Sequence, residues 1–85
     1  MGPVTQVRIR RVGQPAMPAI YVATRLIGLL RPRWSVSLDH MEDDLIVLRI
    51  SAAGAPDARP VEQAVAEMRT QFEAEANWGW KLESA

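Results

Sequence analysis

The residues best suited to acid–base or metal chemistry lie in one short polar stretch. His40, the only histidine of the chain, follows Asp39 and precedes Glu42, Asp43 and Asp44. Carboxylates beside an imidazole can transfer protons or hold a cation. The spacing matches neither a calcium-binding loop nor a zinc site, and one histidine is too few for a histidine-rich site. We therefore interpret the stretch as an acidic, solvated turn and expect neither a metal nor a cofactor.

Other catalytic arrangements are also missing from the sequence. The chain has no cysteine, which excludes disulfide bonds, zinc–thiolate sites and a thiol nucleophile. It contains no Gly-x-Ser-x-Gly elbow and no Gly-rich phosphate-binding loop, since Gly13 stands alone before the first predicted helix. Catalysis needs a nucleophile with a base, placed carboxylates or a metal cluster. We therefore expect a protein without enzymatic activity.

Length and charge indicate one ordinary globular domain, residues 1–85. The chain is 48% hydrophobic and 24% charged, with a net charge of zero, so no overall field draws it onto nucleic acid or a membrane. Residues 1–33 carry six arginines and no acid, and the net negative charge of residues 34–85 balances the charge of these arginines. These halves could attract each other within one domain, or the opposite half of a second copy, but we interpret the charges first as a mixed, solvated surface. The longest apolar stretch is too short for a bilayer, and no signal peptide is evident, which predicts a cytoplasmic protein.

Hydrophobic periodicity predicts a strand, a helix and a hairpin in the first fifty residues. Val4 to Val12 alternates as a strand, and Pro18 to Leu30 predicts a helix with two buried faces. Trp34 to Asp39 predicts a half-buried strand with Trp34, Val36 and Leu38 inside. A polar connection, residues 40–44, leads to a central strand from Leu45 to Ile50.

The remaining residues predict a loop, a helix and a final strand. The loop covers residues 52–60, and an amphipathic helix runs from Val61 to near residues 75–77. Trp78, Trp80 and Leu82 then alternate with polar or small residues, as in a short strand. Burying two indoles contributes several kcal/mol, at about 25 cal/mol per Å².

The order β-α-β-β-α-β predicts an α+β fold, a ferredoxin-like plait whose antiparallel sheet carries both helices on one face. Strands one and three should be central. The open face should carry polar residues with Leu45 and Val47 among them: Arg8, Arg10, Ser35, Ser37, Arg49 and Lys81. Arg8, Arg10, Arg49 and Lys81 could contact nucleic-acid phosphates, although the central strands lack the aromatic residues of RNA-recognition modules.

The pattern also resembles that of ACT-type small regulatory domains. The resemblance is carried by the strand at residues 7–12, Gly13 before the first helix, the helix-to-strand passage of residues 26–38 and the amphipathic helix of residues 61–72. It implies a non-catalytic, homodimeric module that binds a small effector, commonly an amino acid, at the dimer seam. Stand-alone domains of this length resemble the regulatory subunits of acetolactate synthase.

By position, the resemblance implies that the turn with Gly13, Gln14 and Ala16 offers backbone N–H groups to a carboxylate, with Ser35 and Ser37 as further candidates. A turn that opens a helix is also an anion site on physical grounds. Two alternatives stay open beside this ligand-sensing homodimer. One is an interaction adaptor or a small subunit of a larger enzyme or assembly, and the other is a nucleic-acid binder.

Overall fold

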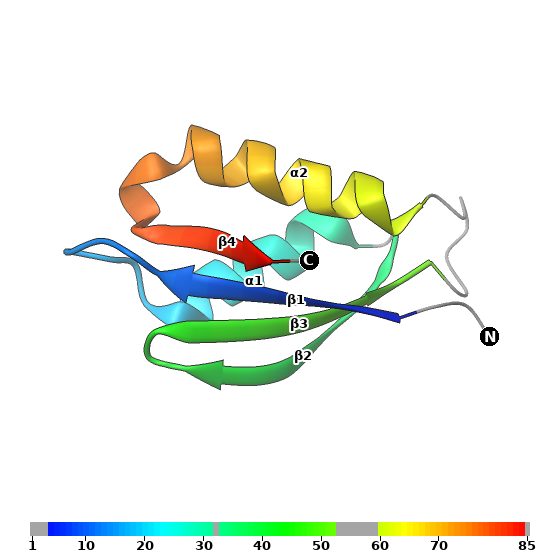
Figure 1. Ribbon diagram of the computed structural model, residues 1–85, viewed down its shortest axis with the longest axis horizontal. Coiled ribbons are helices and arrows are strands. Elements are labelled where there is room, and N and C mark those ends of the chain that lie inside the picture. Colours follow the sequence, from blue (N-terminus) through cyan, green and yellow to red (C-terminus); the bar gives the residue numbers. More distant parts are fainter. Residues whose placement is uncertain (1–3, 32, 53–59, 85) are drawn as a thin grey trace.

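The computed structural model describes residues 4–31, 33–52 and 60–84, and the predicted end of the first helix at Pro32 and most of the predicted loop lie outside them. The described elements follow one another as expected (Figure 1): β1 (Val4–Arg11), α1 (Ala19–Leu30), β2 (Ser35–Glu42), β3 (Leu45–Ser51), α2 (Val61–Ala74) and β4 (Trp80–Ser84). A 3₁₀ turn, η1 (Ala76–Trp78), joins α2 to β4. Pro18 and Pro60 occupy the N-caps of the helices.

The four strands form one antiparallel sheet in the order β2-β3-β1-β4. The two central strands are therefore β1 and β3, as predicted. Val7 lies opposite Leu48, and Arg8 lies opposite Val47, so apolar and charged residues of β1 alternate between the two sheet faces. The α+β class and the antiparallel sheet are confirmed.

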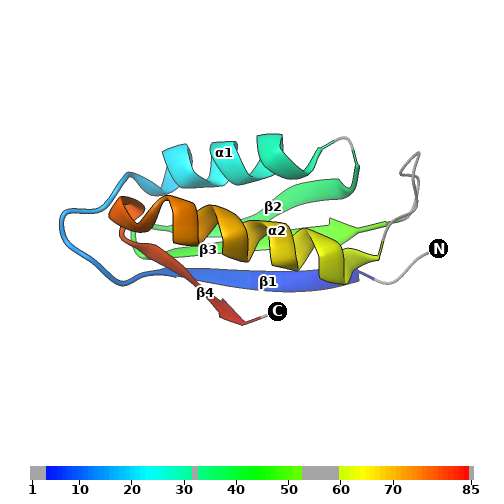
Figure 2. The ribbon, with the colours of Figure 1, turned by 90° about the horizontal axis from the view of Figure 1, so that it is seen from above.

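Both helices and one face of the sheet contribute to a single hydrophobic core. α1 packs mainly against β2 and α2 mainly against β4 (Figure 2). Each helix buries residues that recur at three- and four-residue steps, which is the spacing of one helical face. The core residues of the helices and strands are Val7, Ile9, Val22, Ala23, Leu26, Leu30, Val36, Ile46, Leu48, Ile50, Val61, Ala64, Val65, Met68, Phe72 and Trp80.

The strand predicted to end at Asp39 continues to Glu42, which corrects the expected polar connection. A β-bulge at Asp39 shifts the pairing by one residue, so that His40 pairs with Val47 and Met41 with Ile46. The extra residue reverses the alternation, and a strict period of two cannot continue past it. The predicted burial of Leu38 was also wrong. Its side chain is 42% exposed because β2 is an edge strand.

The carboxy-terminal tryptophans are both buried, although only Trp80 belongs to the last strand. Trp78 enters the core from η1 instead, where its ring meets Phe72 and Tyr21 edge to face, at 6.0 Å between ring centroids in both pairs. The predicted strand after α2 is thus confirmed, but it begins at Trp80 and pairs antiparallel with the end of β1.

Residues 78–80 hold the segment that leads into α1, and we call them the Trp-Gly-Trp clasp. The Gly79 carbonyl accepts hydrogen bonds from the amides of Val12 and Gly13, at 2.8 and 3.1 Å. The Trp78 carbonyl accepts one from the Met17 amide at 2.9 Å. The Trp80 indole Nε1–H donates to the Met17 carbonyl at 2.8 Å. These bonds join the chain before α1 to the chain before β4.

Glycine is required at position 79 of the clasp. Gly79 has φ = 78°, and a Cβ there would lie 2.9 Å from the Cβ of Ala16. A Cβ on Gly13 would lie 3.2 Å from the Gly79 Cα. Only glycine adopts positive φ without steric cost. By contrast, Gly28 lies on the exposed side of α1 with no such neighbour within 4 Å.

We predict opposite effects for two glycine-to-alanine substitutions. Gly79→Ala should lower the free energy of unfolding by at least about 1–2 kcal/mol, the cost of the left-handed conformation. Gly28→Ala should raise it by roughly 0.5–1 kcal/mol, because alanine is the better helix former. Urea denaturation measures both changes. Wild-type stability in Gly79→Ala would contradict the account of the clasp.

Candidate functional site

The turn predicted to hold a carboxylate is bound to the clasp. The Gly13 amide donates to the Gly79 carbonyl, and Ala16 packs against Gly79. Gln14 is exposed. The Gly13 N–H group is therefore already paired within the protein, so it is not directed at a ligand.

Ser35 and Ser37 lie at the other end of the sheet from this turn. Both are exposed on β2, and Ser37 pairs with Arg49, which in turn pairs with Gln6 of β1. Gln6 and Gly13 are seven positions apart along β1 and its continuation, which corresponds to about 23 Å at ~3.3 Å per residue. The structure does not bring the five candidate ligand-binding residues together.

The acidic stretch around His40 is occupied by local polar contacts. The carboxylate of Asp39 accepts a hydrogen bond from the Gln6 side chain at 2.7 Å and lies 3.9 Å from the Arg49 guanidinium. The His40 imidazole lies 2.6 Å from the Glu42 carboxylate. Within the described residues, no group of three or more histidine and acidic side chains is placed to hold a metal ion.

The arginines of the outer sheet face are paired with nearby acids. This face carries Arg8, Arg10, Leu45, Val47 and Arg49. Glu83 sits at a bulge of β4 and accepts hydrogen bonds from Arg8 at 3.1 Å and Arg10 at 2.6 Å. Asp44 lies 3.8 Å from Arg10. The hydrogen bond from Arg10, followed by that from Arg8, holds the pKa of Glu83 below its usual range. The hydrogen bond with Glu83 also raises the pKa of Arg10.

These ion pairs join the basic first half of the chain to the acidic second half. Arg8 and Arg10 pair with Glu83, and Arg33 binds Glu67 of α2 at 2.6 Å. Attraction between the two halves, the less favoured of the two interpretations of the sequence, thus occurs within one domain. Of the four residues considered for nucleic acid, Arg8, Arg10 and Arg49 already have acidic partners, and only Lys81 has none among the described residues.

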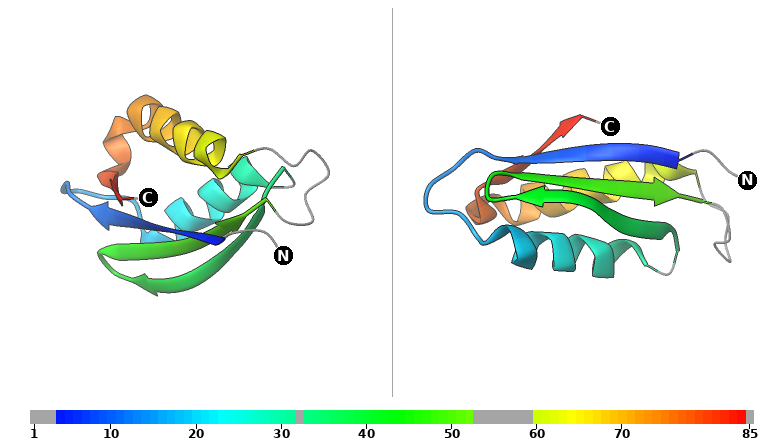
Figure 3. Two further views of the ribbon diagram at one scale, coloured as in Figure 1. Left: turned by 45° about the vertical axis from the view of Figure 1, so that its right-hand side comes forward. Right: turned by 90° about the horizontal axis from the view of Figure 1, so that it is seen from below.

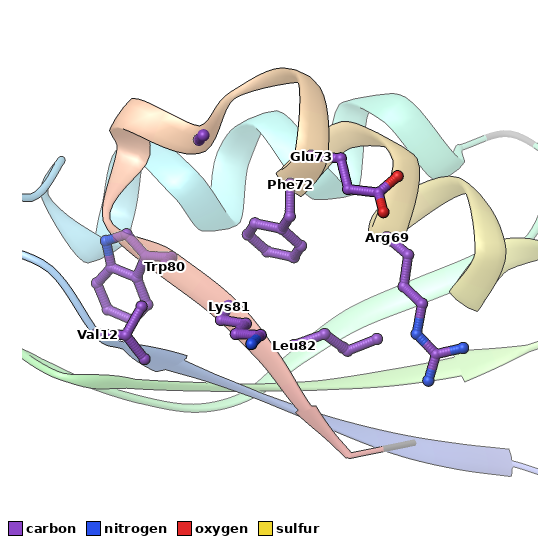
Figure 4. Close-up of a pocket in the computed structure, with 8 residues that line it drawn as sticks. Val12, Arg69, Phe72, Glu73, Trp80, Lys81 and Leu82 are labelled. Atoms are coloured by element: carbon purple, nitrogen blue, oxygen red, sulfur yellow. The ribbon is translucent and has the colours of Figure 1, made fainter.

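A groove lies between α2 and β4 (Figure 4). Its volume is about 330 Å³. In Figure 4, the Phe72 ring projects from α2 into the opening, Trp80 and Val12 close one end, and Leu82 lies below. The Arg69 side chain descends from α2 toward the sheet at the other end. The lining residues are Val12, Arg69, Phe72, Glu73, Ala76, Trp80, Lys81 and Leu82.

β4 is shorter than the strand beside it. β1 has eight residues, whereas β4 has five and pairs only with Arg8–Arg11. The sheet below the first turns of α2 therefore lacks an outer strand. A second depression of about 350 Å³ lies there, lined by Thr5, Val61, Glu62, Val65 and Arg69. Arg69 lines both depressions and stands between them.

The periodicity of the sequence does not reveal this groove. Arg69 lies opposite the apolar stripe of its helix, and Lys81 is placed by alternation on the outer face of β4. Both reach the groove because their side chains are long and β4 is an edge strand. The signal in the sequence is the shortness of the last strand, combined with the aromatic residues Phe72 and Trp80 on the two elements that should meet.

No family model, curated protein or solved structure matches this chain. No described helix has the length and hydropathy that crossing a membrane requires. Any assignment of function therefore depends on the groove and the surface around it.

We predict that Glu83 contributes a pH-dependent part of the stability. Because Arg10 and Arg8 lower its pKa in the folded state, the ionised carboxylate stabilises the fold above the ordinary pKa of 4.5. This stabilisation is lost as the pH falls through the lowered folded value. Glu83→Gln should therefore unfold at lower temperature than wild type at pH 7, and the difference should shrink in acid and in high salt.

The matched control is Asp43→Asn, which neutralises an exposed carboxylate of the β2–β3 turn that has no ion pair among the described residues. It should show no comparable dependence on pH. Thermal melts between pH 3 and pH 7 measure both variants. A Glu83→Gln deficit that is equal at every pH would show that the ion pairs do not cause it.

Proposed function

We propose that the protein is a small, non-catalytic regulatory domain that binds a small effector in the groove between α2 and β4. The observation that carries this proposal is the groove itself. Ligand sites are concave, largely apolar and aromatic, and carry a few polar groups, with volumes from about 300 Å³ upwards. The groove fits each part of this description: Phe72, Trp80 and Leu82 form its apolar lining, and Arg69, Glu73 and Lys81 are its charged residues.

The chemical composition of the groove favours binding over catalysis. Its titratable residues are Arg69, Glu73 and Lys81. A covalent mechanism needs a nucleophile activated by an adjacent base, and this set offers neither a serine, a cysteine nor a histidine. A site that recognises and releases an effector needs only the apolar lining and the charges.

We also propose that the fold is a ferredoxin-like plait with both helices on one face. The element order, the strand order β2-β3-β1-β4 and the core shared by α1 and α2 support this. In the view from below in Figure 3, α2 lies behind the strands and α1 runs alongside β2. The resemblance to ACT-type domains remains a prediction, and we place the effector in the α2–β4 groove instead of at Gly13, whose amide is already paired.

A second candidate function is association with a protein partner, either a second copy or a larger assembly. The observation that favours it is the exposure of apolar side chains near the clasp. Val12 is 65% exposed, Ile20 59% and Tyr21 39%. The helix from Pro18 to Leu30 was predicted to bury two faces, and Ile20 and Tyr21 in its first turn are exposed in the single chain. Nucleic-acid binding is disfavoured, because the arginines of the outer sheet face already pair with acids.

We predict that filling the groove abolishes effector binding. Ala76 lines the groove, whereas Ala74 is exposed at the end of α2 and does not. Ala76→Phe should therefore remove any ligand-induced rise in melting temperature, and Ala74→Phe should preserve it. A ligand at a hundredfold excess over its dissociation constant stabilises a protein by about 2.7 kcal/mol, which a thermal shift screen of small acids and amino acids detects. Binding that survives in Ala76→Phe would place the effector elsewhere.

Partner association makes a different prediction. If the apolar surface near the clasp holds a second copy, the double variant Ile20→Ser, Tyr21→Ser should shift a dimer to monomer in sedimentation velocity without altering effector binding. A wild-type chain that is monomeric at millimolar concentration, and that purifies without a stoichiometric partner, would remove this candidate.

A further inference from the structure

We infer that the effector is a small amphipathic carboxylate, with an apolar or aromatic body and one anionic group. This inference rests on the proposed function, since it names the chemical class that the same groove accepts. The body of such a ligand would lie between Phe72 and Trp80 and above Leu82, where the lining is apolar (Figure 4). The groove sets two requirements for its ligand. The first is an apolar body, because the walls of the groove are aromatic.

The second requirement, one negative charge, follows from the cations of the groove. Arg69 comes from the α2 wall and Lys81 from the β4 wall. Neither forms an ion pair with a described residue. Elsewhere on the same domain Arg8, Arg10 and Arg33 are held by acids at 3.1 Å or less. Two cations that line an apolar groove, and that have no ion-pair partner among the described residues, complement an anion.

The acid in the groove limits the charge of the ligand. Glu73 stands one helical turn from Arg69 on α2, so the charged residues of the groove sum to one positive charge. A monoanion balances this charge, whereas a second negative group would be repelled by Glu73. A planar carboxylate also matches the fork of a guanidinium, which donates two parallel hydrogen bonds. These arguments favour a monocarboxylate over a phosphate ester or a dicarboxylate.

The groove is partly open to solvent. Its apolar surface is thus available to a ligand without any rearrangement of the clasp. The small volume restricts the ligand to a single ring or a short branched chain.

The test uses the full chain, labelled with ¹⁵N, and probes of matched shape. 3-Phenylpropionate carries the anion, 3-phenylpropionamide is neutral, 3-phenylpropylamine is a cation and phenylalanine is a zwitterion.

We expect 3-phenylpropionate to bind at least about tenfold more tightly than the amide, as one charge-assisted hydrogen bond implies. Its chemical-shift changes should centre on Phe72, Trp80 and Leu82. Equal affinity of acid and amide, or tighter binding of the amine, would overturn the carboxylate class while leaving the groove as a binding site. Tighter binding of phenylalanine than of 3-phenylpropionate would overturn the single negative charge, since that ligand carries an ammonium group beside its carboxylate. No binding of any probe would contradict the proposed function itself.

Charge-removing variants test the same inference independently. Arg69→Gln and Lys81→Gln should each weaken 3-phenylpropionate binding about tenfold and leave the affinity for the amide unchanged. Arg31→Gln is the control, because Arg31 is an exposed arginine at the end of α1 that does not line the groove. Arg69→Lys should restore part of the binding that Arg69→Gln loses. If both groove variants bind the acid as wild type does, the cations do not recognise it and the inference fails.

Discussion

The structure depends most on the hydrogen bonds that the Trp-Gly-Trp clasp makes with the segment before α1. Through them, the carbonyls of Trp78 and Gly79 and the indole of Trp80 determine where α1 begins and where β4 joins the sheet. The same three residues bring Trp78 into the core between Phe72 and Tyr21 and place Trp80 at the end of the groove. One short segment therefore closes the fold and builds a wall of the candidate site.

The distribution of charge follows a related constraint. The sheet face opposite the core has Leu45 and Val47 at its centre, and both are buried although neither belongs to the core. The apolar stems of long side chains can cover such residues while their charged ends stay in water. Arg8 and Arg10 lie opposite Val47 and Leu45 and bind Glu83. Arg8 and Arg10 thus serve the stability of the sheet.

Much of the fold could be predicted from the sequence, because long segments with clear periodicity bury one face. The pattern of Val61 to Phe72 predicts α2, and the alternation of Val7 and Ile9 with arginines predicts β1. The predictions that were wrong concern features that leave no periodic signal in the sequence. The bulge at Asp39 carried β2 on to Glu42, the edge position exposed Leu38, and a 3₁₀ turn displaced Trp78 from the last strand. The groove was missed because hydrophobic periodicity places residues on a helix or strand face but does not show where two packed elements leave space between them.

The measurement that tests the central claim most directly is the set of intermolecular nuclear Overhauser effects between the ring protons of 3-phenylpropionate and the protein. If the groove between α2 and β4 is the effector site, these contacts connect the ligand ring with Phe72, the Trp80 indole and Leu82, the residues that line it. Contacts to Gly13–Ala16 or to Ser35 and Ser37 would contradict the account, since they would return the site to the turn or to the opposite end of the sheet.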